Sequence, residues 1–170
     1  MIEKLEEHWE DILREYKSVR STQEYFEKDL YTGSWEVFPF LFFGQEFPDH
    51  QEACPRTWEL LSALPGLVNA SFSIMRPGTE IQPHTGFTDQ VRRYHLGLEI
   101  PEDCSITIAG QDYQWIPGKL FNFDDTKLHS AYNRSDRDRA ILLFDLRTDS
   151  LLSQAEDQGV ATDLQQRPDH

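Results

Sequence analysis

The spacing of apolar positions changes near residue 68. Over residues 2–19, apolar side chains recur at three- and four-residue steps with charged residues between them, which predicts an amphipathic helix packed on one face. A second helix is predicted over residues 55–64, ending before the turn at Pro65 and Gly66. The aromatic-rich segment 31–47 lacks a clear period, so we expect it to be irregular.

After residue 68 the pattern becomes a series of short β-rich runs separated by turn residues. The predicted strands cover residues 71–75, 92–100, 104–108, 120–123, 129–133 and 139–146. Their spacing favours an antiparallel sandwich or barrel over βαβ units. We therefore predict a mainly β protein, a cupin-like jelly roll or double-stranded β-helix, with the N-terminal helices packed on one face.

The expected organisation is a single catalytic domain over residues 1–149, with a helical part at 1–67 and the β-helix core at 68–149. Residues 150–170 carry few apolar positions, which predicts a polar tail that is partly disordered or a frayed helix. A chain of 170 residues buries enough surface to fold without a metal or disulfides, so any metal is expected to be functional.

Charge narrows the possible partners. Sixteen Lys and Arg against 30 Asp and Glu give a net charge of −14, which argues against nucleic acid and anionic membranes because both are bound by dense basic patches. The longest mostly apolar run, residues 37–43, is too short to span a membrane, and the N-terminus lacks a leader pattern. We expect a cytoplasmic protein with its two cysteines reduced; its oligomeric state is left open.

Two histidines in the β-rich half are candidate metal ligands. His84 and His129 are 45 positions apart, which suits ligands from different strands of one jelly roll, and imidazole binds iron and zinc alike. The alternative for each is a hydrogen-bonded structural histidine.

An arginine is expected to lie near these histidines. If Asn133 pairs with Arg139 across a hairpin, strand parity places His129 and Arg139 on one face, where a dicarboxylate could join the guanidinium to a metal. A one-residue change in turn length would place the two side chains on opposite faces. The alternative for Arg139 is a strand-end cation in contact with water or with a neighbouring Asp. Arg93 and His95 alternate with apolar neighbours and predict a polar row that lines a pocket.

These residues occur within longer motifs. Residues 73–86 read Ser-Ile-Met-Arg-Pro-Gly-Thr-Glu-Ile-Gln-Pro-His-Thr-Gly, residues 93–98 read Arg-Tyr-His-Leu-Gly-Leu, and Phe123-Asp-Asp leads to His129 and then to Arg139. The set closely resembles the aspartyl/asparaginyl β-hydroxylase family over about residues 70–147.

The resemblance implies a double-stranded β-helix that binds Fe(II) and 2-oxoglutarate and uses O₂. By the same resemblance, His84 and His129 are the iron ligands, and Arg139, assisted by Ser73, holds the distal carboxylate of 2-oxoglutarate. Arg93 and His95 are expected to contact its carboxylate beside the metal.

One position departs from the wider oxygenase pattern. Gly86 stands two residues after His84, where a third, carboxylate ligand is usual, and the resembling family shares this glycine. We expect a two-histidine iron site with water in the vacant position and Asp125 accepting hydrogen bonds from that water. The alternative for Asp125 is a turn residue that follows Phe123.

The predicted reaction is hydroxylation of the β-carbon of an aspartyl or asparaginyl group, free, carrier-tethered or peptidyl, with release of succinate and CO₂. Two alternatives stay open: a non-catalytic jelly-roll module that binds a dicarboxylate, and a zinc-dependent hydrolase, which would normally need three protein ligands.

Overall fold

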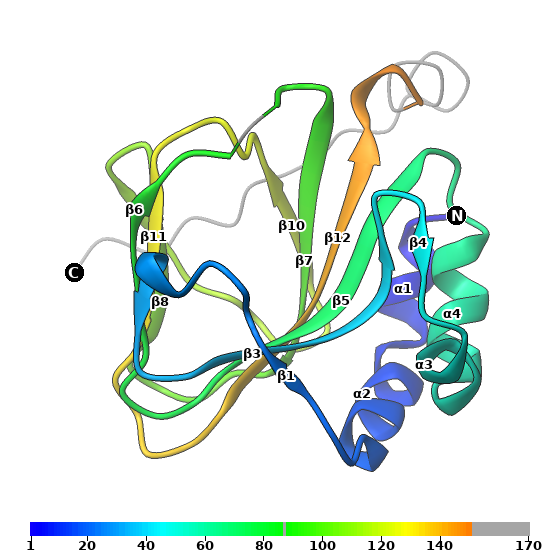
Figure 1. The fold of residues 1–170 in the computed structure, drawn as a ribbon, viewed down its shortest axis with the longest axis horizontal. Coiled ribbons are helices and arrows are strands. Elements are labelled where there is room, and N and C mark those ends of the chain that lie inside the picture. The colour runs from blue at the N-terminus through cyan, green and yellow to red at the C-terminus, as the bar shows by residue number, and fades with distance from the viewer. Residues whose placement is uncertain (87, 151–170) are drawn as a thin grey trace.

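The computed structural model describes residues 1–86 and 88–150, and in that part of the chain two antiparallel sheets face each other with helices on one side (Figure 1). The helices gather on the outer side of the larger sheet, and the smaller sheet lies opposite its inner side. The predicted jelly roll with N-terminal helices on one face is confirmed. The tail predicted at 150–170 lies outside the described residues, apart from Ser150.

Four helices and one 3₁₀ turn precede most of the strands. The helices are α1 (Glu3–Glu7), α2 (Trp9–Ser18), α3 (Pro48–Ala53) and α4 (Pro55–Ser62), and the 3₁₀ turn is η1 (Lys28–Leu30). The single helix expected over residues 2–19 is divided at His8, whose φ of −112° and ψ of 22° are not helical. Both α3 and α4 begin with proline, which suits the first helical turn because its N–H groups need no partner within the helix.

The larger sheet has the strand order β1-β3-β5-β12-β7-β10, with β4 paired to β3. Its strands are β1 (Gln23–Glu24), β3 (Trp35–Phe42), β4 (Gln45–Glu46), β5 (Leu67–Met75), β7 (Val91–Glu99), β10 (Leu120–Phe123) and β12 (Arg139–Arg147). The smaller sheet has the order β2-β6-β11-β8-β9. Its strands are β2 (Tyr31–Thr32), β6 (Glu80–His84), β8 (Cys104–Ile108), β9 (Gln111–Tyr113) and β11 (His129–Asn133).

Two apolar clusters hold these layers together. The first packs α1, α2 and α4 on the outer face of the larger sheet and includes Leu61, Phe72 and Leu96. The second lies between the two sheets and includes Trp115 and Phe121. Period-two alternation in β7 therefore sends Leu96 outward to the helices and the neighbouring His95 inward between the sheets. No helix in the described ranges has the length and apolar character needed to cross a bilayer.

Two further sequence expectations are wrong. The segment 31–47 is not irregular, because β3 pairs with β5 along most of its length and β2 and β4 flank it. Asn133 does not pair with Arg139: it pairs with Cys104 in the smaller sheet, whereas Arg139 pairs with Met75 in the larger sheet. His129 and Arg139 therefore approach a common space from opposite sheets, and the parity argument does not describe their relation.

Candidate active site

A cavity between the two sheets brings the sequence-predicted site residues together. Six of the seven line it: Ser73, His84, Arg93, His95, His129 and Arg139. The seventh, Asp125, borders the cavity beside His129 and Arg93. The smaller sheet supplies the two histidines, and the larger sheet supplies Ser73, Arg93, His95 and Arg139.

His84 and His129 form a pair suited to bind one metal ion. They end β6 and begin β11, they are direct partners in the ladder, and their ring centroids are 4.3 Å apart. In each residue Nδ1 lies 2.7 Å from a backbone carbonyl two positions earlier, at Gln82 and Lys127. A carbonyl only accepts, so Nδ1 carries the proton and Nε2 keeps the lone pair that a metal needs.

The spacing of the two rings also fits a shared ion. Two imidazoles bound at right angles to one ion, with metal–nitrogen distances of about 2.1 Å, have centroids about 4.5 Å apart. The observed 4.3 Å is close to that value. Burial lowers the pKa of His129 below its usual value, which keeps this imidazole neutral and able to bind a metal. Among the described residues, no group of three or more His, Cys, Asp or Glu side chains could hold a metal ion.

Gly86 leaves room for the carboxylate of Asp125. The Gly86 N–H donates to the Asp125 carbonyl at 2.7 Å, and a Cβ added at Gly86 would lie 1.8 Å from Asp125 Oδ2. Asp125 Oδ1 is 3.4 Å from His129 Nε2, the nitrogen that keeps the lone pair. The carboxylate next to the histidine pair therefore comes from position 125 and not from position 86.

Arg139 is a buried cation with no anionic partner in the described part of the chain. The residue is 2% exposed, and it forms no ion pair with a carboxylate of the described residues. Nη2 donates to the Ser73 carbonyl at 3.2 Å and to Ser73 Oγ at 3.1 Å, whereas Nε has no hydrogen-bond partner among the described residues. Burial lowers the pKa of Arg139 to about 10. A charge kept out of water in this way favours an anionic ligand in the cavity.

Trp115 orients both His95 and Arg139. Its indole Nε1 donates to His95 Nδ1 at 3.0 Å, and its ring lies 4.6 Å from the Arg139 guanidinium carbon. Burial and the positive charges of Arg139 and Arg93 hold the pKa of His95 well below its usual value. A neutral His95 that accepts at Nδ1 carries its proton on Nε2 and can donate it to a ligand.

A glycine in β7 brings the Trp115 loop close to the sheet. A Cβ at Gly97 would lie 2.3 Å from the Ile116 carbonyl oxygen, so a side chain there would push the loop away. The Gly118 N–H also donates to the Gly97 carbonyl at 2.8 Å. Gly97 thus allows the backbone at Ile116 to approach the strand closely, a role that glycine often has in strands.

Arg93 differs from Arg139 because protein carboxylates surround it. Nε and Nη2 donate to the two oxygens of Asp145 at 2.9 and 3.0 Å, and Nη1 lies 3.1 Å from Asp125 Oδ1. Asn69 Nδ2 donates to Asp145 at 2.9 Å. These contacts fix Arg93 on the inner face of the larger sheet, and they raise its pKa against the opposing effect of burial.

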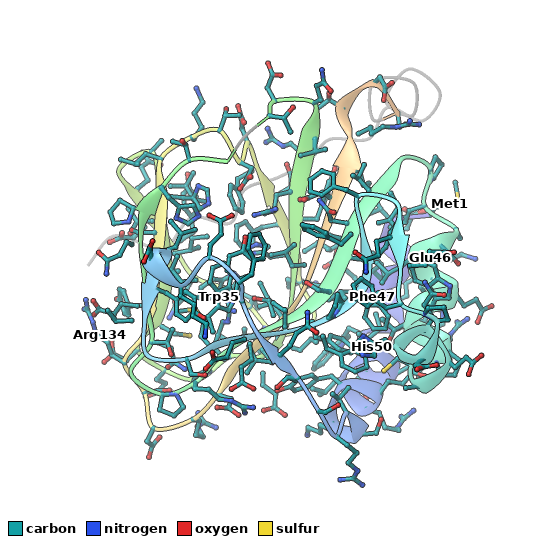
Figure 2. All side chains as sticks on the ribbon, in the orientation of Figure 1. Met1, Trp35, Glu46, Phe47, His50 and Arg134 are labelled. Atoms are coloured by element: carbon teal, nitrogen blue, oxygen red, sulfur yellow. The ribbon has the colours of Figure 1, made fainter. Side chains whose placement is uncertain are left out.

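Three residues of the site were missed by the sequence analysis. Trp35 lines the cavity, lies between the two sheets in Figure 2, and donates from Nε1 to Ser73 Oγ at 2.9 Å. Trp115 gives no local signal beyond its size. Asp145 could have been found, because it is a charged residue in the apolar run of β12 and shares by parity the face of Arg139.

The fold and the cavity define a jelly-roll protein whose candidate active site combines two imidazoles with a buried arginine. Residues 6–149 match the family described as Aspartyl/Asparaginyl beta-hydroxylase, and the chain belongs to that family. This agrees with the resemblance carried by the sequence motifs.

Several relatives are similar to this chain over part of their length. A Rhizobium tropici protein named ornithine lipid ester-linked acyl 2-hydroxylase is 39% identical over 65% of this chain and 41% of its own length. Aspartate beta-hydroxylase domain-containing protein 2 of Mus musculus is 31% identical over 85% of this chain and 47% of its own. Human aspartyl/asparaginyl beta-hydroxylase is 34% identical over 67% of this chain and 16% of its own. The chain thus spans less than half of each.

Solved structures support the fold alone. A predicted oxalate decarboxylase from Thermotoga maritima superimposes with a TM-score of 0.52 over 76% of this chain and 95% of its own, at 14% identity. A cupin-like protein of the same organism gives a TM-score of 0.51 over 78% of this chain and 83% of its own, at 9% identity.

Proposed function

We propose that the protein is an Fe(II)- and 2-oxoglutarate-dependent dioxygenase that hydroxylates a C–H bond. The observation that carries the proposal is Arg139, a buried guanidinium without a carboxylate partner in the described chain. It lies in the same cavity as two histidines whose Nε2 atoms carry no proton. A dicarboxylate with a keto group at one end supplies both missing partners, because its distal carboxylate suits the guanidinium and its other end suits a metal.

The residues have distinct roles in this proposal. His84 and His129 hold Fe(II), which together with 2-oxoglutarate supplies the oxidising chemistry when bound. Arg139 and Ser73 bind the distal carboxylate, and His95 donates from Nε2 to the carboxylate beside the metal. Asp125 keeps a carboxylate close to the histidine pair, where it orders polar groups around the ion.

Arg93 has a role that differs from the one expected from the sequence. We propose that Arg93, held in place by Asp145, mainly positions the Asp125 carboxylate. It then contributes less to binding the co-substrate carboxylate than Arg139 does. The sequence prediction that Arg93 contacts the co-substrate directly stays a prediction.

A more specific part of the proposal is the group that is hydroxylated, the acceptor. The family description supports an aspartyl or asparaginyl group hydroxylated at its β-carbon, free, carrier-tethered or peptidyl. The name of the Rhizobium tropici relative instead specifies an ester-linked acyl chain. The same residues around the metal serve either acceptor, because they bind only the ion and the co-substrate.

Anaerobic titration tests the co-substrate site directly. Fe(II) and 2-oxoglutarate added together should give a visible metal-to-ligand absorption band, and His129→Ala should abolish it. Admission of O₂ with an acceptor should then produce succinate. Dicarboxylate binding that is independent of Fe(II) and of His129 would instead favour a non-catalytic binding module, and activity supported by Zn²⁺ would favour a hydrolase.

A further inference from the structure

A large groove opens from the candidate active site. It has a volume of about 720 Å³, in the range of small-molecule binding sites. Trp35, Val37 and Pro39, which follow at period two along β3, give the groove an apolar wall. Trp35 and His84 also line the cavity between the sheets, so the two spaces are continuous. The groove therefore leads to a candidate metal ligand.

Three polar side chains on neighbouring strands line one side of this groove. Asp145 of β12 is the ladder partner of Asn69 in β5 and of Arg93 in β7. The side chains are also bonded to one another. Asn69 Nδ2 donates to Asp145 at 2.9 Å, and Arg93 Nε and Nη2 donate to the two carboxylate oxygens of Asp145. We call Asn69, Asp145 and Arg93 the cross-strand row.

One end of the cross-strand row lies at the histidine pair. Arg93 Nη1 is 3.1 Å from Asp125 Oδ1, and this oxygen is 3.4 Å from His129 Nε2. The ladder continues from Arg93 to Phe123 in β10, whose ring lies edge-on 5.2 Å from the His129 ring. A cation bound at His129 would therefore act on Arg93 in two ways, through Asp125 and by repulsion between like charges.

The other end of the row lies at the tip of the β3–β4 hairpin. The Phe43 N–H donates to Asn69 Oδ1 at 3.0 Å and to the Val68 carbonyl at 3.1 Å. Asn69 thus accepts from an N–H on one side and donates to the Asp145 carboxylate on the other. Only one orientation of its amide satisfies both partners. Asn69 therefore joins the backbone of the hairpin tip to Asp145.

The hairpin tip has a strained conformation that this contact helps to hold. Strands β3 and β4 pair as far as Phe42 and Gln45, so Phe43 and Gly44 form a two-residue turn, with φ values of +43° and +86°. Such a turn favours asparagine, aspartate or glycine, and a phenylalanine in it is strained. This strain is similar in size to the contribution of one hydrogen bond. Loss of the bond to Asn69 therefore allows the tip to relax.

The same tip carries exposed aromatic rings at the mouth of the groove. Phe42 and Phe43 are 43% and 61% exposed, their rings are 5.0 Å apart, and both line the groove. Large apolar side chains that cluster at the surface in this way mark a binding surface. A molecule that packs on these rings as it enters the groove would hold the tip in one conformation.

We propose that Asn69 is a positioning residue that couples the tip of the β3–β4 hairpin to the candidate metal site through Asp145, Arg93 and Asp125. The coupling rests on the proposed function, because it needs a divalent metal on the histidine pair. A cation there attracts Asp125 and repels Arg93, which tightens the contact of Arg93 with Asp145 and so fixes the row. Because coupling between two sites is reciprocal, a molecule that holds the tip strengthens metal binding.

The first experiment uses Zn²⁺ as the probe and follows binding instead of turnover. Zinc binds imidazole and is diamagnetic, so amide hydrogen exchange can be followed by NMR in the full chain. In wild-type protein, Zn²⁺ should slow exchange of the Phe43 amide about threefold or more. In Asn69→Leu this response should be lost, while amides next to His129 still respond. A Phe43 amide that ignores Zn²⁺ in wild type, or responds equally in Asn69→Leu, would overturn the coupling.

The Asn69→Leu variant should fold, because both groups that Asn69 contacts keep another partner. The Phe43 N–H keeps the Val68 carbonyl, and Asp145 keeps both bonds from Arg93. Leucine also has nearly the volume of asparagine and suits a position that is 7% exposed.

A matched control separates the row from a general effect of losing a buried amide. Asn122 is 3% exposed and accepts from Arg92 Nε at 2.7 Å, outside the cross-strand row. The Zn²⁺ Kd should rise about threefold or more in Asn69→Leu and stay unchanged in Asn122→Leu. Equal effects of the two variants would overturn the role of Asn69.

A second perturbation acts on the hairpin and leaves the row intact. Phe43→Asn relieves the strain, because asparagine tolerates positive φ, so the tip is held better and the Zn²⁺ Kd should fall about twofold. The same change should have no effect on the Kd in the Asn69→Leu background. Phe26→Asn, which alters a 65% exposed ring of the groove outside the row, should not change it either. Additive effects of Phe43→Asn and Asn69→Leu would contradict the coupling.

His129→Ala separates the coupling from the proposed function. If Zn²⁺ binding depends on His129 and the Phe43 amide does not respond, the coupling is wrong and the metal site stands. If His129→Ala leaves Zn²⁺ binding unchanged, the histidine pair holds no metal, and the proposed function fails together with the coupling.

Discussion

Replacing Arg139 by methionine should stabilise the protein while it removes co-substrate binding. Burial lowers the pKa of this guanidinium from 12.5 to about 10, which corresponds to about 3 kcal/mol of penalty for keeping the charge in the folded state. Methionine removes the penalty and fills most of the volume. It also loses the two hydrogen bonds from Nη2 to Ser73, which together contribute about 1–2 kcal/mol.

The balance predicts that Arg139→Met raises the free energy of unfolding by about 1–2 kcal/mol when no ligand is present. At this chain length, each kcal/mol moves the Tm by about 2–4 °C. The ligand response should change in the opposite direction. Wild-type protein gains about 2.7 kcal/mol with 2-oxoglutarate at 100 times its Kd, whereas the variant should gain almost nothing at the same concentration.

Thermal unfolding with and without 2-oxoglutarate measures both effects in one series. Arg147→Met is the matched control, because Arg147 lies on the same strand but is 59% exposed and should change stability by less than about 0.5 kcal/mol. If Arg139→Met unfolds below the wild-type Tm and still shows the full ligand shift, Arg139 is neither an unpaired buried charge nor the carboxylate anchor.

Three further predictions concern residues around the same cavity. Trp115→Phe keeps a ring but removes the N–H that fixes the His95 tautomer, so 2-oxoglutarate Kd in calorimetry should rise about fivefold; an unchanged Kd would contradict this role. Gly86→Asp should cost about 3 kcal/mol or more in urea unfolding because of the overlap with Asp125, and adding Asp125→Gly should recover most of it; a fully stable single variant would refute the overlap. His95 and His129 have lowered pKa values in the fold, so the unfolded state binds more protons than the folded state below pH 6.5. The free energy of unfolding of the metal-free protein should therefore fall between pH 7 and pH 5, by up to about 1.4 kcal/mol per pH unit for each histidine. A flat profile would show that neither histidine is neutral in the folded protein.

The alternation of polar and apolar positions in one strand was enough to predict that Arg93 and His95 line the pocket. Arg93 and His95 alternate with side chains that pack on the helices, and this period alone places them inward. The pairing of His84 with His129 could not be derived in this way, because it depends on β6 and β11 being neighbours in the smaller sheet. The family resemblance supplied the expectation that both histidines bind one iron ion.

Strand β3 was missed for a physical reason. One face of it packs on the helices through Phe38 and Phe40, and the other lines the groove through Trp35 and Val37, so apolar residues occur on both faces and hide the period of two. Pro39 lies within this strand at a register shift in the ladder to β5, where its missing N–H is tolerated.

The place of Arg139 shows a limit of parity arguments. The turn after Asn133 is compatible with a hairpin, and sequence-adjacent strands often pair. Here the chain crosses to the other sheet, so that the cation faces the histidines across a gap instead of along a strand. Only the sheet topology distinguishes these two arrangements.

The two halves of the pocket have separate origins in the chain. Most of the apolar wall of the groove comes from residues 23–47, whereas the histidine pair and the guanidinium come from β6, β11 and β12. Substitutions in the earlier segment can therefore change which molecule enters without altering the histidine pair or the buried guanidinium. Such a division gives evolution, or an engineer, a way to diversify specificity on an unchanged catalytic framework.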